Sequence, residues 1–526
     1  MPRQRKREER VVQFFLSPQS DPKVLLNYGL VAYPPLDQIV PKSQDQILAL
    51  GSTQAYPSKI FSKFPHISAL AFAQYMTDLT NKRKTYRLLS FTRSEVYTSN
   101  PANIEHILLT NFSNYGKVWY HHGVLEDLLG DGIFTVDGEQ WRHQRKSASY
   151  QFSTKLLREF SSSVFKSSAV KLAGIVSEAA ISNNIIELQD LFMKSTLDSV
   201  FKIILGVELD TMWGTYREGA EFSIAYNAAS EAIMFRYVNF FWKVQRFLNI
   251  GSEAVLKKSL RVIDNYVYKV LTTPQVNSLG LKGDMLSRFL ELNETNPKYL
   301  KDIILSFINA GKDTTAITLS WFIYQLCKHP HVQEKIAKEI REAIKVEDGL
   351  TIDELAAKVT EESMEKMQYL HAALTETIRL HPAVPVESKY CFSDDTLPDG
   401  YSVRKGDLVS FQPYVMGRMK FLWGEDAEQF RPERWLDQNG NFKNESLFKF
   451  TAFQAGPRIC IGKDFAYRQM KIFSAVLLGS HGFTLADQNK LVKYRIMLTL
   501  QIDGGLHVYA FHRNKYWPFY GTHLPL

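Results

Sequence analysis

The chain has 526 residues, of which 45% are hydrophobic and 22% charged, values typical of a folded globular protein with a sizeable core. Its three cysteines, Cys327, Cys391 and Cys460, are odd in number and far apart, which argues against a disulfide framework and a zinc cluster and favours a reducing compartment. The net charge of +8 suits an anionic membrane surface or an acidic protein partner, and no nucleic-acid-binding module accompanies it.

Taken in chain order, the predicted elements are mainly helical. Residues 1–60 are rich in Pro, Ser and Gln and form an atypical N-terminal segment without a recognisable membrane anchor. Two strands are predicted at 85–90 and 94–99, and a helix starts near Pro101. Apolar residues at three- and four-residue spacing predict helices over 153–181, 186–206, 218–247, 252–271, 281–292, 298–328, 331–345, 361–380 and 462–478.

Short strands and turns are predicted between residue 383 and the last helix. The pattern therefore predicts one large domain over 61–513, mainly α with a smaller β-rich part, followed by a C-terminal tail at 514–526.

The segment FQAGPRICIG has the spacing FxxGxRxCxG, and each of its five defined positions has a physical role. Gly456 permits a tight turn, and Gly462 lets the backbone approach the sulfur closely. Arg458 supplies a fixed cation, and Phe453 can shield the sulfur from water. Cys460 lies just before a predicted helix, whose free N–H groups lower the pKa of a thiol. The pattern indicates a thiolate that ligates a metal.

This segment resembles the haem-ligand loop of the cytochrome P-450 family, and the resemblance covers roughly residues 61–513. It implies the P-450 fold, and haem b held by the Cys460 thiolate with Arg458 beside a haem propionate. It also implies a monooxygenase that uses O2 and NADPH-derived electrons from a flavoprotein reductase. A thiolate ligand promotes cleavage of the O–O bond. The expected reaction inserts one oxygen atom into a C–H bond of an apolar substrate.

A second motif, ExxR, stands in ALTETIRL as Glu376 and Arg379, one turn apart on a helix. In the family this pair joins an arginine from a later Pro-Glu-Arg segment, which here is FRPERW and contributes Arg434. The resemblance therefore implies a semi-buried structural triad, which does not tolerate the loss of one charged member.

A third motif, AGKDTT, lies inside the long helix at 298–328. Glycine in a helix interior is unfavourable by about 0.5–1 kcal/mol relative to alanine, so its presence suggests that the position needs space. The resemblance assigns Thr314 and Asp313 the role of an acid–alcohol pair that delivers protons during oxygen activation.

Upstream, Trp141 and Arg145 form WxxxR in GEQWRHQRK, one helical turn apart. The resemblance implies that the indole N–H and the guanidinium hold a haem propionate.

The segments AGKDTT, ETIRLHPAVPVESKYC and GPRICIGKDFAYRQMKIF are similar to the plant branch of the family that oxidises fatty acids, and more specifically to its 704 group. This similarity implies hydroxylation of a long-chain fatty acid at or near its terminal carbon. Phe307, Ile308 and residues 383–386 are expected to line the substrate pocket.

The resemblance also implies attachment to the cytosolic face of the endoplasmic reticulum membrane, although no transmembrane anchor is visible. Near Cys460, the cations Lys463, Arg468 and Lys471 could form a basic face for an acidic reductase.

Two other functions remain open. A haem-thiolate enzyme that rearranges peroxides would keep Cys460 but could lose Thr314, and the intact AGKDTT argues against it. A non-catalytic lipid-binding relic would be expected to lose one of the motif residues, and none is lost. Cys327 is expected to pack inside a helix and Cys391 to lie in a strand, neither as a ligand.

Overall fold

The computed structural model describes residues 30–32, 69–89, 94–272, 284–291, 295–345 and 349–513. Apart from residues 30–32, the predicted N-terminal segment 1–60 and the predicted tail 514–526 lie outside this part of the chain. No helix in the described ranges is both long enough and apolar enough to cross a bilayer.

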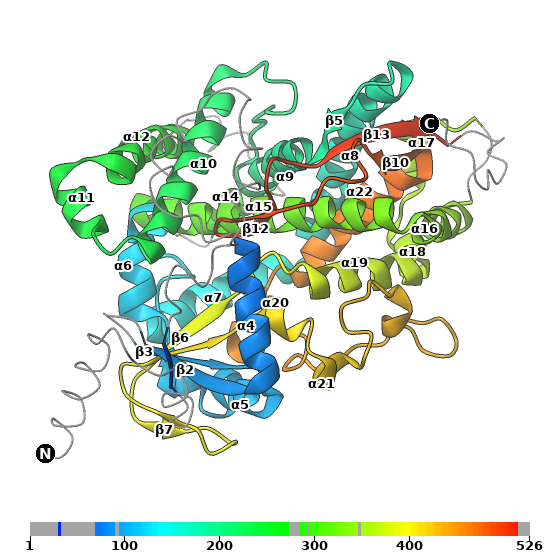
Figure 1. Ribbon diagram of the computed structural model, residues 1–526. Helices are drawn as coiled ribbons and strands as arrows, with labels where there is room; N and C mark the ends of the chain where they lie inside the picture. The colour runs from blue at the N-terminus through cyan, green and yellow to red at the C-terminus, as the bar shows by residue number, and fades with distance from the viewer. Residues whose placement is uncertain are drawn as a thin grey trace, which may run out of the picture.

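Helices dominate the fold, and the largest sheet lies at one end of the molecule (Figure 1). The predicted class, mainly α with a smaller β-rich part, is confirmed. The helices are α4 (Ala69–Lys82), α5 (Pro101–Glu105), α6 (Val118–Leu129), α7 (Gly138–Ser153), α8 (Lys155–Ile181), α9 (Leu188–Leu205), α10 (Arg217–Val238), α11 (Trp242–Leu248), α12 (Gly251–Thr272), α14 (Met285–Glu291), α15 (Pro297–Lys328), α16 (Pro330–Ala343), α17 (Ile352–Lys358), α18 (Glu361–Lys366), α19 (Gln368–Leu380), α20 (Pro413–Met416), α21 (Lys420–Trp423) and α22 (Lys463–Ser480).

The longest of these helices, α15, crosses the centre of the molecule (Figure 1). It starts where the Asn296 side chain accepts the N–H groups of Lys298 and Tyr299, at 3.0 and 3.2 Å. It ends before Pro330, as the residue that precedes a proline disfavours helix. Helices α9, α19 and α22 pack around it, so most of its residues are buried. The functional groups of α15 are therefore held on a rigid element.

The main sheet has six strands in the order β1-β2-β3-β9-β6-β4. Its strands are β1 (Leu30–Ala32), β2 (Thr85–Leu89), β3 (Ser94–Thr98), β4 (Tyr115–Gly116), β6 (Glu387–Cys391) and β9 (Leu408–Phe411). The predicted pair 85–90 and 94–99 is confirmed as β2 and β3, which are antiparallel. Strand β1, which lies in the N-terminal segment 1–60, pairs in parallel with β2.

Smaller sheets complete the β-rich part. The first joins β5 (Ile186–Glu187), β10 (His481–Leu485) and β13 (His507–His512), and the others are the pairs β7 (Asp395–Thr396) with β8 (Ser402–Val403) and β11 (Tyr494–Ile496) with β12 (Leu500–Ile502). The β11–β12 hairpin is tied to the core, because Leu500 N–H donates to the Ala383 carbonyl (2.9 Å) and its own carbonyl accepts Trp321 Nε1–H (2.9 Å).

Two helices predicted as continuous are broken. The stretch 218–247 divides at Asn239, whose side-chain oxygen accepts the Phe241 N–H (3.0 Å) and so satisfies a donor outside the helix. The stretch 361–380 divides at Met367, where the Glu339 carboxylate accepts the N–H groups of Tyr369 and Leu370. In the second case, a side chain from another helix supplies the cap, which periodicity cannot reveal.

Candidate active site

The segment around Cys460 forms a closed turn directly before α22. Gly456 adopts a left-handed φ of +65°, and a side chain there would collide with the Leu108 carbonyl. The Cys460 N–H donates to the Phe453 carbonyl at 2.8 Å, which closes the turn. A Cβ atom on Gly462 would lie 4.0 Å from the Cys460 sulfur. The backbone therefore passes close to the sulfur where the sequence has glycine.

The Cys460 thiol is accessible from a large cavity that it lines, and it is otherwise surrounded by protein atoms. Burial raises the pKa of this thiol, while the Gly462 N–H and the charges of Arg145 and Lys463 lower it. The expected lowering of the thiol pKa by N–H groups at the helix terminus is present at Gly462, but desolvation of the sulfur outweighs it, so the net shift is upward. Coordination to a metal deprotonates a thiol outright, so ligation does not require a low pKa in the chain itself.

Arg458 and Trp141 lie in contact beside this loop. The guanidinium of Arg458 lies 4.3 Å from the Trp141 ring centroid, donates to the Val136 carbonyl at 2.9 Å and forms an ion pair with Asp137. Its Nε atom is buried and has no hydrogen-bond partner. Arg145, on the same helix as Trp141, also lines the cavity. The structure thus brings together all three residues that the motifs single out for a propionate.

Three further charged residues join this cluster and were not predicted from the sequence. Lys117 forms an ion pair with Glu387 at 3.2 Å, and Lys389 donates to the Gln454 side-chain oxygen at 3.3 Å. Lys389 is almost fully buried, and burial lowers its pKa well below the ordinary value. In the sequence, Lys389 is only a lysine within a strand. The fold shows that β6 places it in the interior beside the loop.

These residues fit the carboxylates of a haem. Three cations that line the cavity near Cys460 (Lys117, Arg145 and Arg458) outnumber their anionic partners Glu387 and Asp137, so the cluster carries an excess of positive charge even without Lys389. Haem b carries two propionates, which this positive charge would attract. The unpartnered Arg458 Nε–H offers a donor to one of them. Among the described residues, no cluster of three or more His, Cys, Asp or Glu could hold a bare metal ion.

Helix α15 presents Thr314 to the cavity. The Thr314 hydroxyl donates to the Ala310 carbonyl at 2.5 Å. Asp313 is buried and forms an ion pair with Lys312, whose ammonium also donates to the Asn227 side chain at 2.8 Å. The predicted pair is therefore adjacent in sequence, but Thr314 lines the cavity while the Asp313 carboxylate is held by Lys312.

The glycine of this motif has a packing reason. A Cβ atom on Gly311 would lie 2.7 Å from Val200 Cγ2 on α9, which is closer than such contacts allow. Val200 on α9 therefore occupies the space that a side chain at position 311 would need. Gly311 also lines the cavity.

The cavity has a volume of about 1500 Å³ and extends from Cys460 past α15 to α10 and the β11–β12 hairpin. Its lining is largely apolar and includes Phe307 and residues 383–386, as expected. The expectation for Ile308 is wrong, because this side chain is fully buried in the core and does not line the cavity. An elongated apolar molecule can be enclosed here.

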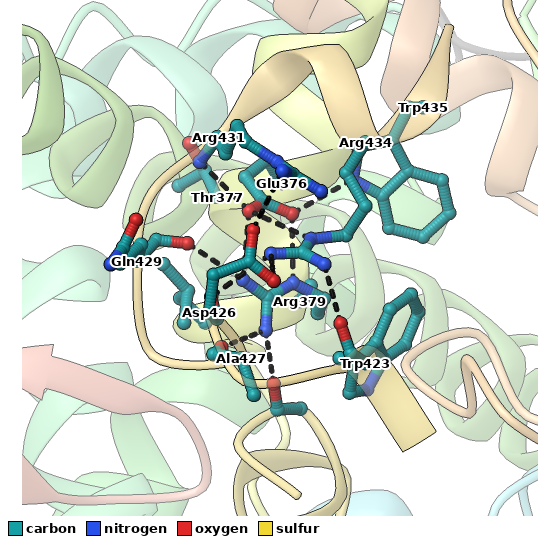
Figure 2. A network of polar contacts seen from close by, with 12 residues as sticks. Glu376, Thr377, Arg379, Trp423, Asp426, Ala427, Gln429, Arg431, Arg434 and Trp435 are labelled. Atoms are coloured by element: carbon teal, nitrogen blue, oxygen red, sulfur yellow. Dashed lines mark hydrogen bonds and ion pairs between the residues drawn. The ribbon is translucent and has the colours of Figure 1, made fainter. Parts of the chain in front are cut away.

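Behind the cavity, Glu376 and Arg379 form a fully buried pair in which two nitrogens of Arg379 contact the two carboxylate oxygens, each at 2.7 Å (Figure 2). Arg434 approaches Glu376 at 3.5 Å and donates to the Trp423 carbonyl at 2.7 Å. Glu376 also accepts from the Trp435 indole at 2.9 Å. The structure therefore brings the three predicted residues together in one network that ties α19 to the Pro-Glu-Arg segment.

Of the three cations proposed as a basic face on α22, Lys463 lies over the Phe453 ring at 5.8 Å, and the other two are engaged with a neighbouring helix. Arg468 forms an ion pair with Glu361 at 2.9 Å, and Lys471 donates to the Met364 carbonyl at 2.8 Å. Burial lowers the pKa of Lys471 to about 8. Both side chains are thus engaged with α18, which packs beside α22, and neither is available as a solvent-facing cation.

The other two cysteines stand apart from the site. Cys327 packs against the core in α15, and burial raises its pKa to about 12. Cys391 is buried in β6 and donates to the Ser393 carbonyl at 2.9 Å.

Comparison with known proteins assigns the chain to a family. The family model described as Cytochrome P450 matches residues 56–505. The chain belongs to the cytochrome P450 family. It is 47% identical to Cytochrome P450 704C1 of Pinus taeda over 86% of this chain and 92% of that protein. It is 42% identical to Cytochrome P450 704B1 of Arabidopsis thaliana over 83% and 90%, and 36% identical to Cytochrome P450 94A1 of Vicia sativa over 79% and 81%.

Membership identifies the chain as a haem-thiolate monooxygenase, an oxidoreductase that incorporates one oxygen atom from O2 with NADPH-derived electrons. The relatives belong to the same plant groups that the three sequence segments resemble. Of the readings left open by the sequence, these matches support the monooxygenase over the peroxide-rearranging enzyme and the relic.

Proposed function

We propose that this cytochrome P450 hydroxylates a long-chain fatty acid at or near its terminal carbon. The observation that carries the proposal is the largely apolar cavity, of which a haem would occupy the part beside Cys460 while the rest extends to α10 and the β11–β12 hairpin. A long acyl chain buries its methylene groups in such a space and presents its far end to the reacting centre. Similarity to the 704 and 94 groups supports the same substrate class.

In this proposal, Cys460 would supply the sulfur ligand of a haem, and the haem would supply the oxygen chemistry. Arg458, Trp141 and Arg145 would bind its propionates. Phe453 packs beside Tyr467 and shields the loop from water, with ring centroids 5.6 Å apart. Gly456 allows the left-handed turn that closes the loop, and Gly462 lies beside the sulfur.

Thr314 holds a proton at the cavity wall, and its bond to the Ala310 carbonyl sets the direction of the hydroxyl. Asp313 connects the interior to Lys312 and Asn227 on the other side of α15. In this proposal, the Asp313 carboxylate leaves Lys312 and then passes protons to the Thr314 hydroxyl.

We also propose that the enzyme works at the surface of the endoplasmic reticulum membrane with an NADPH-dependent flavoprotein reductase. The support is a patch of exposed apolar side chains around α11, here called the α11 patch. It consists of Val238, Phe240, Phe241, Val244, Phe247, Leu248 and Ile250, each at least half exposed. It lies at an outlying corner in Figure 1. Val238 also lines the cavity, so the patch adjoins the substrate path.

The test is a product assay with the purified haem-containing chain, a plant flavoprotein reductase, NADPH and free fatty acids of increasing length. The expected products are hydroxy acids with the new group at or near the terminal carbon, formed only when NADPH is present. Rearrangement of a fatty-acid hydroperoxide without NADPH would instead identify the peroxide-rearranging enzyme. Absence of acid binding in haem-loaded protein would rule out the proposed substrate class.

A further inference from the structure

The cavity has a second group of charged residues, at the end that faces solvent. Glu231 on α10 and Lys493, Arg495 and Asp503 on the β11–β12 hairpin all line it. The side chains of Arg495 and Glu231 are 47% and 41% exposed, so this group lies at an opening and not in the interior. This group is separate from the cations near Cys460, which would bind the haem propionates.

At this opening, Arg495 already holds a carboxylate. Its Nη2 atom donates to Glu231 Oε1 at 2.7 Å and so bridges the hairpin and α10. Lys493 is two residues away in the extended chain, on the same face as Arg495. The Asp503 N–H donates to the Lys493 carbonyl at 2.8 Å, which joins the two arms of the hairpin here.

The position of Arg495 is well supported. Its neighbour Tyr494 points into the core, where its ring centroid lies 5.1 Å from that of Trp321 and 5.6 Å from that of Tyr414. The partner strand β12 is fixed to the core through Leu500. A guanidinium on so fixed a strand can select one ligand position, which a flexible loop could not do.

We propose that Arg495 binds the carboxylate of the fatty-acid substrate at the cavity opening, in place of Glu231. The proposal rests on the proposed function, since it needs a substrate with one anionic end. Transfer of that carboxylate into the apolar interior would be strongly unfavourable, so it stays where solvent and a cation are both present. A guanidinium binds carboxylates with two parallel hydrogen bonds.

Exchange of the two carboxylates is energetically accessible. A solvent-exposed ion pair contributes little net stability, so release of Glu231 from Arg495 is a small loss. The four charged groups at the opening are balanced, two positive and two negative. Glu231 therefore competes with the substrate, and its removal leaves a net positive opening for a free acid.

The experiment measures equilibrium binding of a long-chain fatty acid and of its methyl ester to the full-length haem-loaded enzyme, by the shift of the haem absorption on substrate binding. We expect Arg495→Gln to weaken binding of the acid by about threefold to fivefold, the loss expected for a partly exposed ion pair. Binding of the ester, which has no charge, stays within about twofold of wild type on the same reasoning. Glu231→Gln, which keeps Arg495 and removes its competitor, tightens binding of the acid and leaves the ester unchanged.

The matched control is Arg217→Gln. Arg217 also forms an exposed ion pair on α10, with Glu221 at 2.9 Å, but does not line the cavity. This variant is expected to bind acid and ester like the wild type.

Three results would overturn the inference. If Arg495→Gln binds the acid as tightly as wild type while the wild type still hydroxylates it, the carboxylate is held elsewhere and only the inference fails. If the variant loses acid and ester binding equally, Arg495 supports the hairpin and does not recognise charge. If haem-loaded wild type binds neither compound, the proposed function fails as well. If the Arg495 variant folds poorly, Glu231→Gln still tests the proposal, because acid binding no tighter than in wild type would contradict it.

Discussion

At the scale of single residues, the site depends on where charge and sulfur are buried. The spacing FxxGxRxCxG identified Cys460, Arg458, Gly456 and Gly462, and the left-handed turn at Gly456 is a backbone geometry that a local motif encodes. The pKa of Cys460 was misjudged, because desolvation depends on the surrounding fold. Lys117 and Lys389 were missed for the same reason, since they meet the loop only across the tertiary structure.

Replacement of Cys460 by alanine is expected to abolish thiolate ligation. The reduced, carbon-monoxide-bound protein should lose the strongly red-shifted Soret band that a thiolate ligand produces, while far-UV circular dichroism stays unchanged. Cys327→Ala is the matched control, because this cysteine packs in α15 away from the cavity. A retained thiolate band in Cys460→Ala, or its loss in Cys327→Ala, would contradict the assignment.

Glu376→Gln removes the negative charge that two buried arginines share. Arg379 and Arg434 would then stand without a counter-charge, so we expect a loss of about 3–5 kcal/mol in the free energy of unfolding. Chemical denaturation followed by circular dichroism measures it. Glu139→Gln breaks an exposed pair with Arg142 on α7 and should have no measurable effect. Equal stability of the two variants would show that the triad is not structural.

At the scale of elements, apolar periodicity located most helices, and capping determined where they end. The long helix was placed to within one residue at each end, since Asn296 and Pro330 mark its limits in the sequence itself. The break at Met367 was not visible, because the capping group is Glu339 from a different helix. The break at Asn239 had a local signal, an asparagine within a helical pattern, that periodicity overruled.

The α11 patch, which follows the break at Asn239, can be tested for binding to a lipid surface. Replacement of both Phe241 and Phe247 in the α11 patch by serine should weaken binding to lipid vesicles by about tenfold per ring, because each ring loses apolar area that the bilayer would bury. Sedimentation with vesicles that contain anionic lipid measures the partition. Ile181→Ser is the control, since Ile181 is 79% exposed at the end of α8, remote from the patch. Unchanged partition of the double variant would place the membrane contact elsewhere.

At the scale of the whole molecule, the fold keeps several histidines buried and neutral. Burial, with the charge of nearby Lys117 or Lys471, lowers the pKa of His121 and of His371 to about 3. Burial and His512 lower that of His481 to about 4. In the unfolded chain these groups titrate near 6.5, so between about pH 4 and 6.5 the unfolded state binds more protons.

Stability is therefore expected to be complete above about pH 6.5 and to fall as the pH is lowered toward 4. Each histidine adds up to about 1.4 kcal/mol per pH unit to this slope. His371 lies between Phe442 and Tyr467, so His371→Phe fills the same space and should flatten the slope measured by urea denaturation. The exposed His331, changed to Gln, should leave the slope as it is. An unaltered slope in His371→Phe would exclude its contribution.

The sequence by itself determined the family, the helical class and the residues of the haem-ligand loop, because these depend on local spacing and on glycines with a fixed backbone role. Only the tertiary structure decided which charges converge at the two ends of the cavity, that Lys471 is covered, and that Arg495 faces Glu231. Those outcomes depend on distances between segments hundreds of residues apart, on desolvation and on shared hydrogen bonds, none of which a local pattern contains.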